Sequence, residues 1–190
     1  MKNLARKQRF AAFEEAIKRG PYDEYPMLPS GVDPQVCLSR NNQIQPFYLI
    51  CEHDTVLVNM SGEGRVEFIA GPVRYHELLP GDFVYVPAGT AHRIFPEGEC
   101  VHLRYKPEHP GFEAVAWYCE ECGQELTRST WDTAVELPQE GYLRACQEYN
   151  ASADIRMCSF CQHSHAPIDL SPFNWGPVAQ EIREDLESTQ

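Results

Sequence analysis

Four cysteines in the C-terminal third of the chain are arranged in two pairs that have the spacing of metal ligands. Cys119 and Cys122 form one Cys-x-x-Cys unit, and Cys158 and Cys161 form the second. Each unit turns two thiolates towards one ion, so the two units together predict a tetrahedral site for Zn or Fe. Four protein ligands leave no open position for a substrate, and we therefore expect a structural rather than a catalytic site. Four unrelated buried thiols are the alternative, which the repeated spacing disfavours.

A second motif that points to chemistry ends at His92. Gly81, Pro87, Gly89 and His92 follow the spacing G-x5-P-x-G-x2-H. Glycine and proline at these places predict turns on both sides of a short strand, which would direct His92 into a β-barrel as a metal ligand or substrate contact. A histidine that is satisfied within the core is the alternative. The spacing closely resembles the second conserved motif of the cupin proteins.

The elements that must position these residues are short strands separated by turns. Residues 1–20 have the apolar spacing of a helix, which Gly20 and Pro21 end. Eight short strands in the following region predict a jelly roll or barrel. The predicted strands are Val36–Ser39, Phe47–Cys51, Thr55–Met60, Arg65–Ile69, Val73–Leu78, Phe83–Val86, Ala91–Phe95 and Cys100–Tyr105.

The remainder of the chain follows this predicted barrel. Residues 106–116 have the composition of a linker, residues 137–150 fit either a strand or a helical turn, and residues 178–186 fit a short amphipathic helix. We therefore expect an N-terminal helix and Pro-rich arm over residues 1–35 and a barrel over 36–106. A linker, the four-cysteine knuckle and a C-terminal tail would follow over 107–190.

Charge and composition exclude several classes of function. The formal net charge of −12 argues against a nucleic-acid partner, which would require a basic surface. No apolar run reaches the roughly 18–20 residues of a membrane span, and no apolar segment of a signal peptide follows the basic N-terminus. We therefore expect a cytoplasmic protein without a membrane partner, in which cysteines bind metal instead of forming disulfides.

The run from about Val36 to Pro167 resembles the bacterial 3-hydroxyanthranilate 3,4-dioxygenase family. The resemblance implies a mainly β fold, with a cupin (double-stranded β-helix or jelly-roll) barrel, an N-terminal helix and a C-terminal, rubredoxin-like four-cysteine metal knuckle. It also implies an oxidoreductase of the dioxygenase type, a homodimer, a barrel Fe(II) or other divalent metal, and a small carboxylate-bearing substrate that is aromatic or derived from an amino acid. The resemblance rests on the motif at His92 and on the segments Trp117-Tyr118-Cys119-x-x-Cys122-Gly123, Leu137-Pro138 and Cys158-x-x-Cys161-Gln162 with His165.

The iron ligands of that family are only partly present. The family uses two histidines and one glutamate, which leave open positions on the iron for substrate and O2. His92 matches one histidine, whereas the other histidine corresponds to Leu49 and the glutamate to Thr55. A glutamate that binds the substrate amino group corresponds to Arg104. Because leucine cannot bind iron and threonine is a poor ligand, a barrel metal would need a non-standard site.

Neighbouring residues provide candidates for such a site. Side chains two apart on a strand share a face, so residues 51 and 53 would point inward with residue 55, and residue 102 with residue 104. An unpaired arginine in the barrel would favour an anion such as a carboxylate, because a buried charge needs a partner. The alternative places residue 53 in an exposed turn and leaves the barrel without metal. The predicted catalytic residues are Cys51, His53, His92 and His102, and the predicted substrate-binding residues are Thr55 and Arg104.

Three functions remain open on the sequence. The first is a diverged dioxygenase-like enzyme that acts on a small carboxylate through the non-standard barrel metal. The second is a non-oxidative cupin enzyme, such as an isomerase, lyase or hydrolase, with His53, His92 and His102 as ligands. The third is a binding or partner protein that retains the barrel without the iron ligands. The fold alone does not choose among them.

Overall fold

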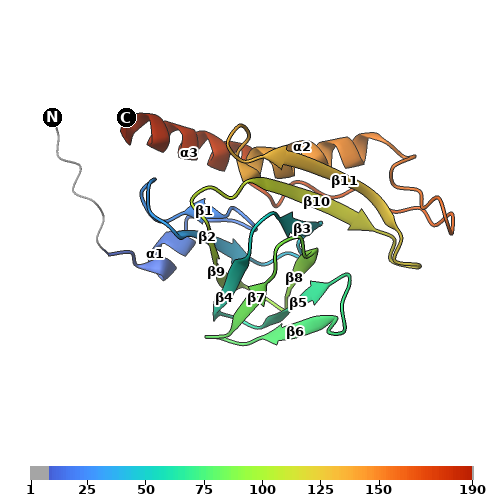
Figure 1. Cartoon of the computed structure of the whole chain (residues 1–190), viewed down its shortest axis with the longest axis horizontal. Coiled ribbons are helices and arrows are strands. Elements are labelled where there is room, and N and C mark those ends of the chain that lie inside the picture. The colour runs from blue at the N-terminus through green and yellow to red at the C-terminus, as the bar shows by residue number, and fades with distance from the viewer. Residues whose placement is uncertain (1–8, 190) are drawn as a thin grey trace.

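The computed structural model describes residues 9–189, which fold into two antiparallel β-sheets, with two helices along one side and a short helix near β2 (Figure 1). The first sheet contains, in spatial order, β1 (Tyr25–Pro26), β2 (Gln35–Asn41), β9 (Cys100–Lys106), β4 (Thr55–Ser61) and β7 (Phe83–Val86). The second sheet contains β11 (Glu125–Asp132), β10 (Phe112–Tyr118), β3 (Tyr48–Cys51), β8 (His92–Pro96), β5 (Gly64–Phe68) and β6 (Tyr75–Leu78).

The main hydrophobic core lies between the two sheets. Leu57 and Val84 from the first sheet belong to the same buried cluster as Leu49, Ile94 and Val115 from the second. On β3, Leu49 and Cys51 belong to this core and the alternate residues Tyr48 and Ile50 to a second cluster, as expected when successive side chains point to opposite faces of a sheet. The architecture confirms the predicted mainly β, cupin-type barrel, and the four cysteines form a cluster near the C-terminal end.

All eight predicted strands are present, with ends that differ by a few residues. Three further strands were not predicted: the two-residue β1 lies in the predicted Pro-rich arm, β10 occupies part of the predicted linker, and β11 follows the first cysteine pair. Strand β10 pairs with β3, so that Glu113 lies opposite Cys51 and the second sheet extends beyond the predicted barrel. The division of the chain at residues 35 and 106 stays a prediction.

Three helices accompany the sheets: α1 (Ala12–Ala16), α2 (Pro138–Ala151) and α3 (Trp175–Thr189). Helix α1 is much shorter than the predicted helix over 1–20, of which residues 1–8 lie outside the described part. The undecided stretch 137–150 is helical, and the C-terminal helix is longer than predicted. Helix α2 lies next to β10 and β11, and α3 lies against α2 and close to β1 (Figure 1). None of the helices within residues 9–189 has the length and apolar character of a membrane span.

An arm between α1 and β1 inserts into one end of the barrel. Tyr22, Asp23 and Glu24 are all buried, with 6 % or less of their surfaces exposed. The backbone N–H of Tyr22 donates to Asn41 Oδ1 at 2.7 Å, and that of Glu24 donates to Ser39 Oγ at 2.9 Å. The arm therefore delivers a carboxylate, that of Glu24, into the interior of the barrel.

Candidate functional site

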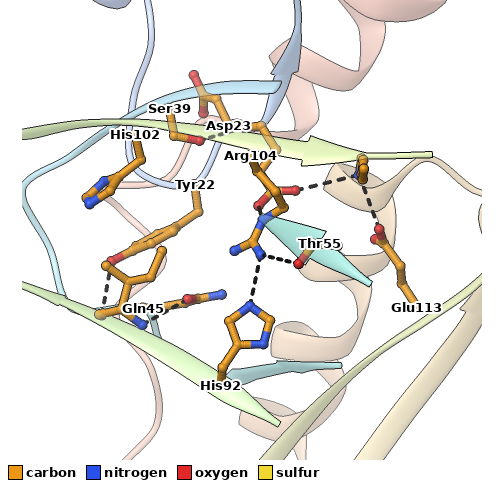
Figure 2. A network of polar contacts seen from close by, with 12 residues as sticks. Tyr22, Asp23, Ser39, Gln45, Thr55, His92, His102, Arg104 and Glu113 are labelled. Atoms are coloured by element: carbon orange, nitrogen blue, oxygen red, sulfur yellow. Dashed lines mark hydrogen bonds and ion pairs between the residues drawn. The ribbon is translucent and has the colours of Figure 1, made fainter. Parts of the chain in front are cut away.

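The inner end of the barrel brings together three residues that the sequence analysis selected. Thr55, His92 and Arg104 come from β4, β8 and β9, and all three side chains point into the space between the sheets (Figure 2). Each is buried, with 3 % or less of its surface exposed. Leu49 lies opposite His92 in the pairing of β3 with β8, and it is the residue that the resemblance noted in the sequence analysis matches to the other histidine.

The guanidinium of Arg104 occupies the centre of this group. Its Nη1 lies 2.9 Å from His92 Nε2 and 3.3 Å from Thr55 Oγ1, and its Nε donates to Glu24 Oε1 at 2.7 Å. A guanidinium only donates hydrogen bonds, so His92 Nε2 must accept this one. The proton of the neutral imidazole is therefore assigned to Nδ1, which lies 3.0 Å from the carbonyl oxygen of Thr90.

The charge state of His92 follows from these neighbours. Burial, and secondly the positive charge of Arg104, lower the pKa of His92 from 6.5 to about 3. A neutral imidazole is the form that binds metal, but its only free lone pair, on Nε2, points at the guanidinium. The position that a metal would take is thus filled by a side-chain cation.

A barrel metal therefore does not fit the residues present. Leu49 and Thr55 stand at the positions where the sequence resemblance would place metal ligands, and His92 is committed to Arg104. Among the described residues, the four cysteines form the only group of three or more Cys, His, Asp or Glu side chains placed to hold one ion.

The other predicted site residues do not converge on His92. Strand β3 ends at Cys51 and β4 begins at Thr55, so His53 lies exposed in the turn between them. The expectation that His53 points inward is wrong, and the alternative of an exposed turn is confirmed. The prediction assumed one regular strand, whereas the chain bends after Cys51.

His102 and Cys51 are buried but have other surroundings. His102 Nδ1 lies 2.8 Å from Asn41 Nδ2, and burial, then the charge of Arg104, lower its pKa to about 3. Burial raises the pKa of the Cys51 thiol to about 12. Both groups are therefore neutral at physiological pH, and their predicted catalytic roles stay predictions.

Arg104 is paired, contrary to the expectation of an unpaired arginine. Glu24 balances its charge, and a second pair, Lys106 and Glu113, lies next to the first with Nζ and Oε1 3.1 Å apart. Lys106 Nζ is also 3.6 Å from Glu24 Oε2, and the Tyr142 hydroxyl donates to the same oxygen at 3.3 Å. The network holds two cations and two carboxylates, so its formal charge is zero.

The pKa of Glu24 reflects this balance. Burial alone would raise it, but the attraction of Arg104 and then of Lys106 lowers it below the ordinary value. Burial raises the pKa of Glu113, which Lys106 only partly opposes. We take Glu113 as ionised because its carboxylate lies within salt-bridge distance of an ammonium whose own pKa is raised by Glu113.

Sequence reasoning missed most members of this network. Glu24 lies in a stretch that was predicted to be an irregular arm, and Glu113 lies in the predicted linker. Tyr22 and Glu24 have φ angles of 56° and 42°, which non-glycine residues rarely adopt and which mark a constrained segment. The period-2 pattern Cys100, His102, Arg104 could have been extended to Lys106, which also points inward.

The four-cysteine cluster fits a metal well. All four Sγ atoms lie within 4.8 Å of one another, and two of the pairs, Cys119–Cys161 and Cys122–Cys158, are 3.5 and 3.6 Å apart. A Zn–S bond of about 2.3 Å in a tetrahedron would separate the sulfurs by about 3.8 Å. The two cysteine loops have matching turns, in which the N–H of Gly123 and of Gln162 donates to the carbonyl of the first cysteine.

Gly123 and Gln162 both have positive φ angles, of 74° and 63°. This conformation closes each loop tightly and directs both thiols of a pair towards the same point. The predicted metal knuckle is therefore present as an arrangement of ligands, and four thiolates would occupy all positions of a tetrahedral ion.

No family model matches the chain, and no curated protein sequence is similar to it. Among solved structures, the chain is similar to hydroquinone 1,2-dioxygenase from Sphingomonas sp. TTNP3 with 4-hydroxybenzoate bound (TM-score 0.44, 18 % identity, 50 % of this chain and 71 % of that one). It is also similar to a double-stranded β-helix protein from Klebsiella pneumoniae (TM-score 0.45, 18 % identity, 58 % of this chain and 97 % of that one). A cupin-2 domain protein from Shewanella frigidimarina is a third example (TM-score 0.41, 17 % identity, 50 % of this chain and 91 % of that one). Similarity at this level decides nothing about activity.

Proposed function

We propose that this chain is a small-molecule-binding cupin whose barrel contains a built-in cation instead of a metal, and whose single metal is structural. One observation carries the proposal: Arg104 Nη1 lies 2.9 Å from His92 Nε2, the atom that a barrel metal would require. Of the three functions left open by the sequence, this supports the third, a protein that retains the barrel without the iron ligands.

Electrostatics argue against adding a metal beside the guanidinium. Two unit charges about 4 Å apart interact by about 4 kcal/mol at an effective dielectric constant of about 20, so a divalent ion would be repelled by about 8 kcal/mol. Displacing Arg104 to avoid this repulsion would leave a charged group buried and would break its bond to Glu24. Neither route offers a metal the ligands that offset such a cost.

The dioxygenase function remains the competing hypothesis. It rests on the resemblance to 3-hydroxyanthranilate dioxygenases, and it needs Fe(II) in the barrel and a substrate carboxylate near Arg104. Glu24 neutralises the charge of Arg104, which weakens the argument for a carboxylate ligand, although the buried Nη2 of Arg104 has no hydrogen-bond partner among the described residues. The homodimer and the cytoplasmic location stay predictions.

The metal of the cysteine cluster would act as a cross-link. It would join the loop after β10 to residues 158–161, and the N–H of Cys158 bonds the carbonyl of His163 at 2.8 Å. His165 follows, with its N–H on the carbonyl of Arg156. A closed four-thiolate site contributes folding free energy to such a segment, and Zn and Fe both suit it.

Metal content per folded chain tests the proposal. We expect one metal in the wild type, none in the Cys119→Ser/Cys122→Ser variant and one in His92→Ala, measured by plasma mass spectrometry after gel filtration. Oxygen uptake with aminophenol or catechol acids should stay at the buffer rate. Two metals in the wild type, with one lost in His92→Ala, would overturn the proposal and favour the dioxygenase.

A further inference from the structure

The two sheets have four end strands among residues 9–189, and three of them carry residues that discourage pairing with another chain. Strand β1 contains Pro26, β6 contains Glu77, and β11 contains Arg128 among other charged residues. Proline and charged side chains are the means by which natural proteins protect the edges of their sheets. Strand β7 is the exception, because its four residues are two aromatic residues and two valines.

The backbone of β7 leaves two of these residues without partners. Residues of antiparallel neighbours alternate between pairs that exchange N–H and C=O bonds and pairs that do not. Asn59 N–H donates to the carbonyl of Asp82 at 3.0 Å, and the register therefore directs the backbone groups of Val84 towards β4 as well. The N–H and C=O groups of Phe83 and Tyr85 point the other way, where no strand within residues 9–189 pairs with β7.

The side chains of the same two residues are uncovered. Phe83 and Tyr85 are 69 % and 58 % exposed, and the Tyr85 hydroxyl donates to Asp54 Oδ2 at 2.9 Å, which holds its ring in place. At the other end of the sheet the same outer face is covered, since Leu38 packs in a cluster with Ala16 of α1. The β7 end thus combines free backbone groups with two exposed rings.

We infer that two copies of this chain associate through β7, as antiparallel strands related by a two-fold axis at Val84. Phe83 would then lie opposite the partner's Tyr85, and Tyr85 opposite the partner's Phe83. Each pair would exchange two N–H and C=O bonds, which gives four hydrogen bonds in all. The aromatic rings of each pair would lie on the same face of the sheet, where directly opposite aromatic side chains stabilise strand pairing.

The length of the strand favours a second copy over a longer partner strand. Gly81 and Gly89 have φ angles of 92° and 71° and turn the chain before and after β7, so only four residues are available for pairing. An identical strand has the same length, and its free backbone groups lie at matching positions. A two-fold contact uses the same surface on both copies, so association ends at a dimer in which the two five-stranded sheets join.

The exposed apolar surface around β7 is sufficient for a weak dimer. Five large apolar side chains between positions 73 and 85 are each about half exposed or more: Val73, Tyr75, Leu79, Phe83 and Tyr85. A buried aromatic side chain covers about 150–250 Å², so two copies would together bury at most on the order of 1,000 Å². Interfaces of this size belong to weak and transient complexes, and we therefore expect a dimer that dissociates on dilution.

Sedimentation equilibrium of the full chain, with its structural metal, tests for the dimer. Between about 5 and 500 µM, the average mass should rise from 21.7 kDa towards twice that value. Each copy has a net charge of −12, so screening by NaCl should strengthen the dimer. A single-chain mass at every concentration would overturn the inference, and so would a dimer that dissociates at high salt. The outcome does not depend on the metal content of the barrel, which tests the proposed function separately.

Substitutions at exposed positions tie the dimer to β7. Phe83→Lys adds a charge to this edge and should raise the dissociation constant at least tenfold. Phe112→Lys is the matched control, since Phe112 is a 54 % exposed aromatic residue of β10, and it should change nothing. Equal effects of the two substitutions would place the contact elsewhere and refute the inference.

Amide hydrogen exchange measured by NMR distinguishes strand pairing from simple contact between rings. In the wild type, the N–H groups of Phe83 and Tyr85 should exchange at least twofold more slowly at about 500 µM than at about 30 µM. The N–H of Val84 faces β4 and should show no such change beyond that of the control residues in β10. A dimer that forms without slower exchange at Phe83 and Tyr85 would contradict the inferred pairing.

Discussion

Glu24→Gln removes one negative charge from the barrel interior and leaves the shape of the side chain nearly unchanged. Glu24 Oε1 accepts from Arg104 Nε at 2.7 Å, and Oε2 lies 3.6 Å from Lys106 Nζ. After the substitution, two buried cations face the single carboxylate of Glu113. The side chains of Glu24 and Arg104 are 7 % and 3 % exposed, so water cannot compensate for the lost charge.

The expected cost follows from this burial. Removing one partner of a buried ion pair typically destabilises a protein by about 3–5 kcal/mol, because the other charge stays in the interior. For a chain of this length, 1 kcal/mol corresponds to about 2–4 °C in Tm, so we expect Tm to fall by about 6–20 °C. The total stability of a domain is about 5–15 kcal/mol, and the loss is therefore a large part of it.

Urea unfolding followed by circular dichroism measures the effect, with Glu125→Gln as the matched control. Glu125 pairs with Arg128 at 2.6 Å, but both side chains are about a third or more exposed, so the control should lose less than about 1 kcal/mol. In a double-mutant cycle with Arg104→Met, the two losses should be less than additive. A Glu24→Gln variant as stable as the control, or strict additivity, would refute the argument that the pair compensates two buried charges.

Three further predictions concern other parts of the chain. Gly141→Ala should destabilise the protein by about 1–3 kcal/mol in thermal unfolding, because the new Cβ would lie 2.5 Å from the Trp131 ring. Gly176→Ala is the control and should be neutral or stabilising, because its Cβ would lie 3.6 Å from the nearest atom and alanine favours a helix more than glycine does. The pKa values of His92 and His102 are about 3 in the folded protein and 6.5 in the unfolded chain, so only the unfolded chain takes up protons as the pH falls from 7 to 5. The free energy of unfolding should therefore decrease by about 4 kcal/mol from pH 7 to pH 5 in urea titrations. After chelation, a thiol reagent should label Cys122 and Cys161, which are exposed, and it should label all eight cysteines only in denaturant, since the other six are buried. No pH dependence, or full labelling before unfolding, would contradict these two predictions.

Local signals in the sequence were sufficient for the features that depend on neighbouring residues. The Cys-x-x-Cys spacing identified the cluster because two residues between the cysteines already determine a loop that directs both thiols to one point. The eight strands of the barrel were recognised because turn residues separate them and because their apolar residues alternate. Strand β11 (Glu125–Asp132) was missed because its alternation is weak: only Trp131 is fully buried.

The chemistry of the barrel could not be predicted in the same way, because it depends on partners far apart in the chain. Arg104 and Glu24 are separated by 80 positions, and Tyr142 and Glu24 by 118. Counting residues along β9 placed Arg104 correctly inside the barrel, but nothing near it in the sequence indicates a carboxylate from the N-terminal arm. The error at His53 has a related cause, since strand periodicity does not show where a strand ends.

In the function proposed above, Arg104 takes the place of a metal as the partner of His92. A histidine buried in a barrel needs a partner for Nε2, and in a metal-binding cupin the ion is that partner. Here that partner is Arg104, whose guanidinium donates to the same nitrogen at 2.9 Å. An arginine at this place in turn requires an anion, which the arm supplies through Glu24. Leu49, Thr55, the arginine and the buried arm are thus consistent with the function proposed above, in which a side-chain cation stands at the place of a barrel metal.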